Sequence, residues 1–131
     1  MLPLRNMVLR GASVLVIEED PHTRFVQMRV LMRAGAHVDG VASGREAFLL
    51  CRQRHFNVVI TDLRLPDTPG DALIRAIRAV SSEACIVVLT DEGEPFLSRA
   101  REAGVDRIFS KSTDWPRVLA FLQARELAHA A

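Results

Sequence analysis

Short apolar runs recur along this chain, and each is followed by a polar turn and a segment with helical periodicity. Residues 14–17 and 58–60 are continuous aliphatic runs, which is typical of strands buried on both faces of a parallel sheet. The segment 37–42 alternates polar residues with Val38 and contains Gly40, which favours an edge of the sheet over its centre. In total we expect five strands, at residues 14–17, 37–42, 58–60, 85–89 and 106–110.

Helix signals follow each of these runs. Asp20 caps a helix in which Phe25, Met28 and Met32 recur at helical spacing, and Gly35 ends it. The other helices are expected behind the Ser43–Glu46 capping box, after the turn at 65–70 with Leu73, Ile77 and Val80 on one face, at 95–103 before Gly104, and behind the cap formed by Thr113 and Asp114. Five alternations of strand and helix predict one α/β domain, a doubly wound parallel sheet with helices on both faces.

The composition narrows the class of protein. With 131 residues, of which 49% are hydrophobic and 25% charged, the chain suits one compact core and not a disordered protein. Seventeen basic residues balance 16 acidic ones, so the charge does not favour direct nucleic-acid binding. No apolar run approaches the ~20 residues of a membrane span. Cys51 and Cys85 lie far apart without a CxxC motif, which favours a reducing cytoplasm.

Polar residues follow the ends of four expected strands. They are Glu18, Glu19 and Asp20 after the first, Asp62 after the third, Thr90 and Asp91 after the fourth, and Lys111, the only lysine, after the fifth. In an open α/β sheet ligands bind at this edge. Carboxylates a few Å apart repel by up to ~4 kcal/mol per pair at an effective dielectric near 20, so a bound cation would relieve their repulsion. Oxygen-only ligands favour Mg²⁺ over Zn²⁺.

Each of these residues also has a purely structural explanation. Asp20 suits a helix cap, and Asp62 suits a solvated turn before Pro66. Thr90 suits the end of a β-strand, and Lys111 suits a charged surface. The four histidines have no metal-ligand spacing. The joint placement of acids, hydroxyl and amine at strand ends is what favours a functional site.

In this order the motifs make the chain resemble the receiver domains of two-component response regulators. The resemblance runs from about residue 13 to residue 127 and rests on Ile17-Glu-Glu-Asp-Pro21, Asp62-Leu-Arg-Leu-Pro66 with Gly70, Thr90, and Phe-Ser-Lys111. It implies a flavodoxin-like (β/α)5 fold, a five-stranded parallel sheet with strand order 2-1-3-4-5. Residues 14–131 would form a receiver domain of the stand-alone, single-domain type, and residues 1–13 an N-terminal extension of unknown role.

The resemblance also implies roles for the residues at the strand ends. Asp62 would accept a phosphoryl group from the phosphohistidine of a histidine kinase or phosphotransfer protein, forming an acyl phosphate. Thr90 would donate a hydrogen bond to this group, and Lys111 would neutralise it as a point charge.

The implied cofactor is Mg²⁺, held by Glu18, Glu19, Asp62 and the backbone carbonyl of Arg64. On this interpretation the chain is a phosphoacceptor signalling domain and not an enzyme. It would act in the cytoplasm on an unknown downstream effector protein, without direct contact to nucleic acid or membrane, and homodimerisation is compatible with this role.

Three other functions compete with this interpretation. A receiver-like protein-binding module that is not phosphorylated would explain departures from the family pattern at Asp91, Ile108 and Ser112. An aspartate-nucleophile phosphatase would need a second acid where Arg64 stands. A dinucleotide-dependent oxidoreductase would need a G-x-G-x-x-G motif after the first strand, where the acidic run stands instead.

Overall fold

Five parallel strands form one sheet, as the sequence predicts. The computed structural model describes the backbone of residues 7–130 and the side chains of residues 7–126. The strands are β1 (Ser13–Ile17), β2 (His37–Val41), β3 (Val58–Thr61), β4 (Cys85–Thr90) and β5 (Arg107–Ser110). Their order is β2-β1-β3-β4-β5, which confirms the expected doubly wound topology.

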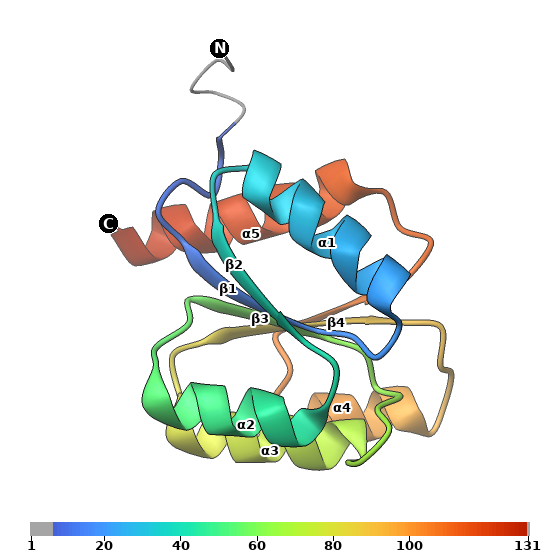
Figure 1. Ribbon diagram of the computed structural model, residues 1–131. Helices are drawn as coiled ribbons and strands as arrows, with labels where there is room; N and C mark the ends of the chain where they lie inside the picture. Colours follow the sequence, from blue (N-terminus) through green and yellow to red (C-terminus); the bar gives the residue numbers. More distant parts are fainter. Residues whose placement is uncertain (1–6, 131) are drawn as a thin grey trace.

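Helices cover both faces of this sheet. They are α1 (Pro21–Arg33), α2 (Gly44–Gln53), α3 (Gly70–Val80), α4 (Phe96–Ala103) and α5 (Trp115–Ala130). α1 and α5 pack on one face, and α2, α3 and α4 pack on the other (Figure 1). In the described part of the chain, no helix combines the length and apolar character needed to cross a bilayer.

Two hydrophobic cores lie on the two faces of the central strands β1, β3 and β4. Successive side chains of a strand point to opposite faces, so neighbouring residues join different cores. Leu15 and Val59 pack with α2, α3 and α4, whereas Val16 and Ile60 pack with α1 and α5. Burial on both faces explains why these strands are continuous apolar runs.

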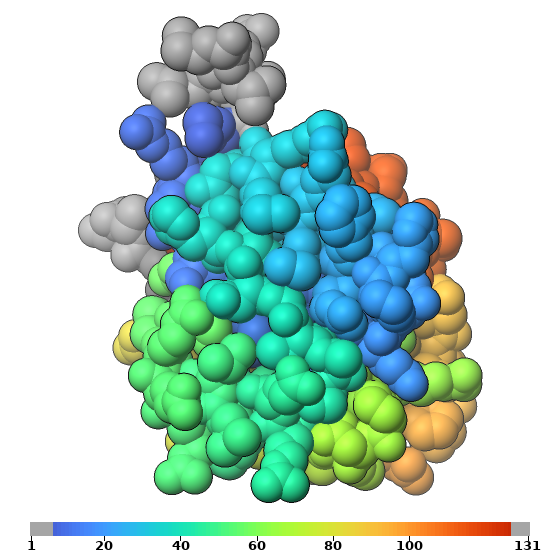
Figure 2. Space-filling model, in the orientation of Figure 1, coloured from blue at the N-terminus to red at the C-terminus, as the bar shows by residue number. Residues whose placement is uncertain are grey.

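Two of the three apolar residues that recur at helical spacing in α1 are exposed. Phe25 and Met32 are 58% and 48% exposed, and the buried residues of the helix are Gln27 and Leu31. Met28, the third residue noted at helical spacing, packs against the core, so spacing alone did not identify the buried face of this helix. α1, β2 and α2 together form the face of the molecule seen in Figure 2. Val80, expected on the buried face of α3, is likewise exposed at the helix end.

The segment before β1 packs against the domain. Leu9 is 1% exposed in the core beneath α1 and α5, and its N–H donates to the Ala34 carbonyl at 2.8 Å. Ala12 is also buried there, and its carbonyl accepts from the His37 N–H at 2.8 Å. Part of the segment that we interpreted as an extension therefore contributes to the core, while residues 1–6 lie outside the described residues.

Candidate functional site

A pocket of about 250 Å³ opens where β3, β4 and β5 end. Its lining residues are Asp62, Arg64, Thr90, Asp91, Glu92 and Lys111. Asp62 directly follows β3, Thr90 ends β4 and Lys111 directly follows β5. Parallel strands bring these three residues to one edge because their carboxyl ends coincide. The structure thus places together the acid, the hydroxyl and the amine that the sequence singled out.

Lys111 joins two buried carboxylates at this edge. Its Nζ lies 2.7 Å from Asp62 Oδ2 and 2.8 Å from Glu18 Oε1. Glu18 is 3% exposed and Asp62 8% exposed. Partial burial lowers the pKa of Lys111, but hydrogen bonds and charge from Asp62 and Glu18 outweigh it and raise the pKa overall. The ammonium therefore stays charged and offsets part of the negative charge of both acids.

Both oxygens of Asp62 have fixed partners. Oδ1 accepts the Leu63 N–H at 2.7 Å, and Oδ2 faces Lys111. The Thr61 hydroxyl donates to the Asp62 carbonyl at 2.9 Å, which fixes the backbone at the end of β3. The carboxylate is thus held in one orientation while it lines the pocket. The orientation of this side chain is therefore set before any ligand enters the pocket.

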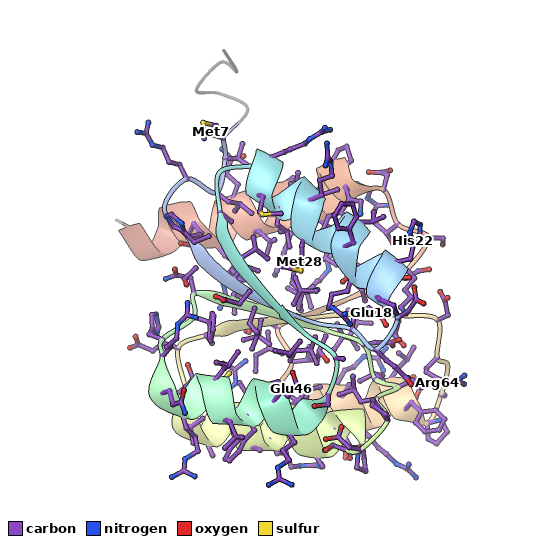
Figure 3. The ribbon with its side chains drawn as sticks, in the orientation of Figure 1. Met7, Glu18, His22, Met28, Glu46 and Arg64 are labelled. Atoms are coloured by element: carbon purple, nitrogen blue, oxygen red, sulfur yellow. The ribbon has the colours of Figure 1, made fainter. Side chains whose placement is uncertain are left out.

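The three acids after β1 have different environments. Glu18 points inward, and its Oε2 accepts the Asp20 N–H at 3.1 Å, whereas the Glu19 side chain is exposed. Asp20 caps α1, accepting from the Thr23 hydroxyl at 2.7 Å and from the Thr23 N–H at 2.8 Å. These hydrogen bonds lower the pKa of Asp20. Figure 3 shows Glu18 and Arg64 at one end of the sheet and Met7 at the other.

An ion pair that the sequence did not reveal crosses the rim of the pocket. Arg64 Nε and Nη2 lie 3.0 and 2.8 Å from Glu92 Oε1, joining the connection after β3 to the one after β4. The Glu92 N–H donates to Thr90 Oγ1 at 3.1 Å. Because this bond uses a lone pair of Thr90, the Thr90 hydroxyl proton remains free to be donated. Asp91 lines the same pocket with an exposed side chain.

The chemistry of these donors suits a hard divalent cation. Within the described residues, no three His, Cys, Asp or Glu side chains are grouped as a preformed metal site. Mg²⁺ does not need such a group, since it is held by one or two carboxylates together with water and phosphate oxygens. Asp62 and Arg64 both line the pocket, and Glu19 supplies an exposed carboxylate on the turn after β1.

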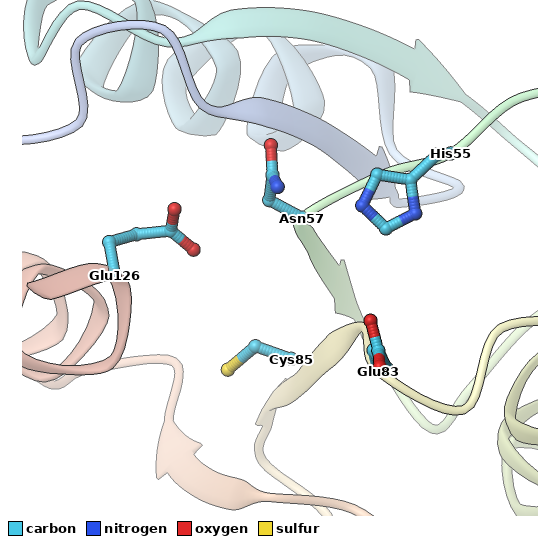
Figure 4. A pocket seen from close by; sticks show the side chains of 5 residues that line it. All are labelled: His55, Asn57, Glu83, Cys85 and Glu126. Atoms are coloured by element: carbon cyan, nitrogen blue, oxygen red, sulfur yellow. The ribbon is translucent and has the colours of Figure 1, made fainter. Parts of the chain in front are cut away.

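A second pocket lies at the opposite, amino-terminal end of the strands. It measures about 110 Å³ and is lined by His55, Asn57, Glu83, Cys85 and Glu126. In Figure 4, Glu126 of α5 faces this space from one side, and His55 and Glu83 face it from the other. Burial raises the pKa of the Cys85 thiol to about 11, so this thiol is protonated and unreactive at neutral pH. Cys85 and Cys51 are both free thiols, and each is buried in one of the two cores.

Comparison with known proteins gives a consistent result. The profile of the family described as the response regulator receiver domain matches residues 14–123. The transcriptional regulatory protein GltR from Pseudomonas aeruginosa is 30% identical over 123 residues, which cover 90% of this chain and 50% of that protein. The chain corresponds to about half the length, or less, of the curated relatives that it matches.

Solved structures share the same architecture. A response regulator protein from Burkholderia pseudomallei, with a phosphorylated aspartic acid, a calcium ion and citrate, has a TM-score of 0.80 at 26% identity, covering 92% of this chain and 74% of that one. The receiver domain of the sensor histidine kinase PA1611 from Pseudomonas aeruginosa has a magnesium ion in its active-site cleft. It has a TM-score of 0.79 at 24% identity, covering 87% and 96% of the two chains. At that identity the likeness shows the fold alone.

Proposed function

Because this chain belongs to the family of response regulator receiver domains, we propose that Asp62 is the residue on which it accepts a phosphoryl group. The observation that carries the proposal is the Lys111 ammonium, 2.7 Å from Asp62 and 2.8 Å from the buried Glu18. An ammonium that lines the pocket and is held by two carboxylates is well placed to bind a phosphoryl oxygen. Alone, an acid after a strand would not support this role.

In the proposed step, one oxygen of the Asp62 carboxylate attacks the phosphorus of a phosphohistidine. The new O–P bond forms as the N–P bond breaks, and the donor nitrogen leaves with the bonding electron pair. The negative charge on the acceptor thereby increases, because a carboxylate is converted into an acyl phosphate. Lys111 stays in contact with this charge, and Thr90 donates its free hydroxyl proton to a phosphoryl oxygen.

A divalent cation completes the proposed site. Of the four ligands that the family resemblance implies, Glu19, Asp62 and the Arg64 carbonyl would contact Mg²⁺, which when bound would supply positive charge to the transferred phosphoryl group. Glu18 has a different task, because its Oε1 anchors Lys111. We assign the direct contact to the exposed Glu19 and the anchoring of Lys111 to Glu18. Two carboxylates, Glu19 and Asp62, then agree with the small number that Mg²⁺ uses.

The remaining parts of the proposal concern partners. The phosphoryl donor would be a histidine kinase or a phosphotransfer protein, and the phosphorylated chain would act through a downstream effector protein in the cytoplasm. The chain would serve as an acceptor that is modified once per signal and not as an enzyme acting on a separate substrate. Homodimerisation on phosphorylation is compatible with this role.

Labelling by a small phosphodonor tests the proposal. Purified protein incubated with acetyl phosphate and MgCl₂ should gain the mass of one phosphoryl group, and the gain should disappear when EDTA replaces MgCl₂. Asp62→Asn should show no gain while unfolding as cooperatively as the wild type. Absence of labelling in the wild type would instead favour the protein-binding module that is not phosphorylated.

A further inference from the structure

Arg24 reaches from α1 back onto the acidic turn that follows β1. Its Nη1 donates to the Glu18 carbonyl at 2.7 Å and makes a longer contact with the Glu19 carbonyl at 3.4 Å. Two consecutive carbonyl dipoles thus converge on one guanidinium nitrogen. Such convergence is unfavourable without a cation, because the oxygens repel each other, and a charged donor offsets that repulsion.

The location of Arg24 is not explained by helix stability. It lies within the first turn and a half of α1, where the helix dipole disfavours positive charge. Its side chain is half-buried, so it is not a solvated surface arginine either. The contacts that it makes are to the backbone of the acidic pair, and these account for its position.

The neighbouring edge strand leaves room for this arrangement. Gly40 of β2 faces α1, and a Cβ at Gly40 would overlap the Met28 sulfur and come within 3.3 Å of Arg24 Cδ. The glycine that interrupts the polar pattern of this strand leaves space into which the Met28 side chain packs between α1 and β2. Close packing brings the Arg24 guanidinium within reach of the turn.

We infer that Arg24 is a positioning residue for the divalent-cation site, acting through the carbonyls of Glu18 and Glu19. By fixing the two peptide planes, it fixes the direction in which the Glu19 carboxylate leaves the backbone. This inference rests on the proposed function, since it takes Glu19 as a ligand of Mg²⁺. The Arg24 guanidinium binds these carbonyls and would act on the cation only through them.

The direction in which the Mg²⁺ affinity changes when Arg24 is replaced distinguishes a positioning role from a purely electrostatic one. Removing a positive charge near a cation site should tighten Mg²⁺ binding if charge alone mattered. Losing an orienting contact should weaken it, because groups that orient metal ligands are typically worth ~10-fold or more in metal affinity. Arg24→Met removes both the charge and the hydrogen bonds, so the direction of change decides between the two.

The experiment is an NMR titration with MgCl₂ that follows the amide signals of Glu19 and Leu63. Matched variants are Arg24→Met, Arg24→Lys and Arg29→Met; Arg29 is an exposed arginine on the same helix. We expect about tenfold weaker binding for Arg24→Met, a smaller loss for Arg24→Lys, which keeps one charged donor, and no weakening for Arg29→Met. Thermal unfolding in EDTA checks that the variants fold.

Two results would overturn the inference. If Arg24→Met binds Mg²⁺ as tightly as Arg29→Met, Arg24 has no positioning role, while the proposed function stands. If the wild type does not bind Mg²⁺ at all, the magnesium part of the proposed function fails together with the inference. Should Arg24→Met not fold, Arg24→Lys decides the matter, and an unchanged affinity in that variant refutes the role.

Discussion

Lys111 is the residue on which the electrostatics of the site depend. Its ammonium lies between Asp62 and Glu18, so one compact charge offsets two buried acids. Arginine supplies all other basic side chains of this sequence. A guanidinium is planar and larger than an ammonium, so it cannot place one compact point charge between the two carboxylates as Lys111 does.

Replacing Lys111 by arginine should therefore impair the site although the charge is kept. We expect labelling by acetyl phosphate to slow by about tenfold, less than the loss typical when a charge-stabilising donor is removed outright. The measurement is the initial rate of phosphoryl mass gain at fixed MgCl₂. Arg117→Lys, the reverse exchange on an exposed position of α5, should leave the rate unchanged. A wild-type rate in Lys111→Arg would show that an ammonium is not required.

Asp91 is the one exposed acid that follows β4 directly and lines the pocket. Its charge should oppose an incoming phosphodonor, and exposed charges interact by only about 0.2–1 kcal/mol, so Asp91→Ala should accelerate labelling severalfold at most. The acceleration should be larger at low salt than at high salt. Glu102→Ala, an exposed acid on α4, is the control. A slower or unchanged rate in Asp91→Ala at low salt would refute the repulsion.

At the scale of elements, the connection between β3 and α3 sets the geometry around Asp62. Asp67 in this connection accepts the N–H groups of Gly44 and Arg45, each at 2.9 Å, and so ties it to the start of α2. These hydrogen bonds lower the pKa of Asp67. The same connection carries Arg64, whose carbonyl is the proposed ligand for Mg²⁺.

Gly70 lets α3 begin directly against this connection. A Cβ at Gly70 would lie 2.6 Å from Leu63 Cα and 2.7 Å from the Leu63 carbonyl oxygen, both backbone atoms. Gly70→Ala should therefore lower the free energy of unfolding by about 1–3 kcal/mol, as overpacking does. It should also shift the Leu63 amide, whose N–H binds Asp62.

The control for Gly70→Ala is Gly93→Ala. A Cβ at Gly93 meets no atom within 4 Å, so the change should stay within about 0.5 kcal/mol. Urea unfolding and amide spectra measure both effects. Equal stability of the two variants would mean that α3 can move away from Leu63 without loss.

At the scale of the whole molecule, a charged network holds the strands at the end opposite the pocket. Arg78 of α3 donates to the carbonyls of Ala84 and Gly104 at 2.6 and 2.7 Å and to Asp106 at 2.9 Å. Asp106 also accepts the Ile86 N–H at 2.8 Å and pairs with Arg125 of α5. One arginine and one aspartate thus connect α3, β4, β5 and α5.

This network should make stability depend on pH. Burial raises the pKa of Asp106, but hydrogen bonds from Ile86 and Arg78 and the charges of Arg125 and Arg78 outweigh it and lower the pKa overall. A lowered pKa in the folded state stabilises the fold above the unfolded value of about 3.9, and the contribution is lost as the pH falls through the folded pKa.

Asp106→Asn tests this dependence. The variant should be less stable by about 1–3 kcal/mol at neutral pH, since the hydrogen bonds to a charged acceptor are weakened. Its stability should also fall less steeply than that of the wild type below about pH 4. Urea unfolding across this pH range is the measurement. If the stability of the two proteins fell in parallel as the pH is lowered, groups other than Asp106 would cause the acid sensitivity.

Much of this architecture follows from the sequence. Continuous apolar runs predicted the central strands, Gly40 predicted the edge strand, and Asp20 predicted the start of α1. The strand ends predicted that Asp62, Thr90 and Lys111 meet in the pocket, because parallel topology alone brings them to one edge. The acids after the first strand were expected at the same edge, but they do not line this pocket.

Other features depend on packing that no local pattern encodes. The buried face of α1 could not be chosen from spacing, because Phe25 and Met32 are as apolar as Leu31, which is the residue that the core buries. The Arg64–Glu92 pair joins residues 28 positions apart through two irregular connections. Their meeting depends on the paths of both loops, which turn residues alone do not specify.

The central claim is that Asp62 carries the phosphoryl group, and chemical trapping tests it most directly. Borohydride reduces an acyl phosphate to an alcohol, which would convert a phosphorylated aspartate into homoserine. Trypsin should release residues 55–64, a peptide in which Asp62 is the sole carboxylate side chain. We predict donor-dependent homoserine in this peptide. The opposite result is homoserine, or the homologue derived from a glutamate, in peptide 11–24 or 79–99 while peptide 55–64 stays unmodified. That result would contradict the claim that Asp62 carries the phosphoryl group.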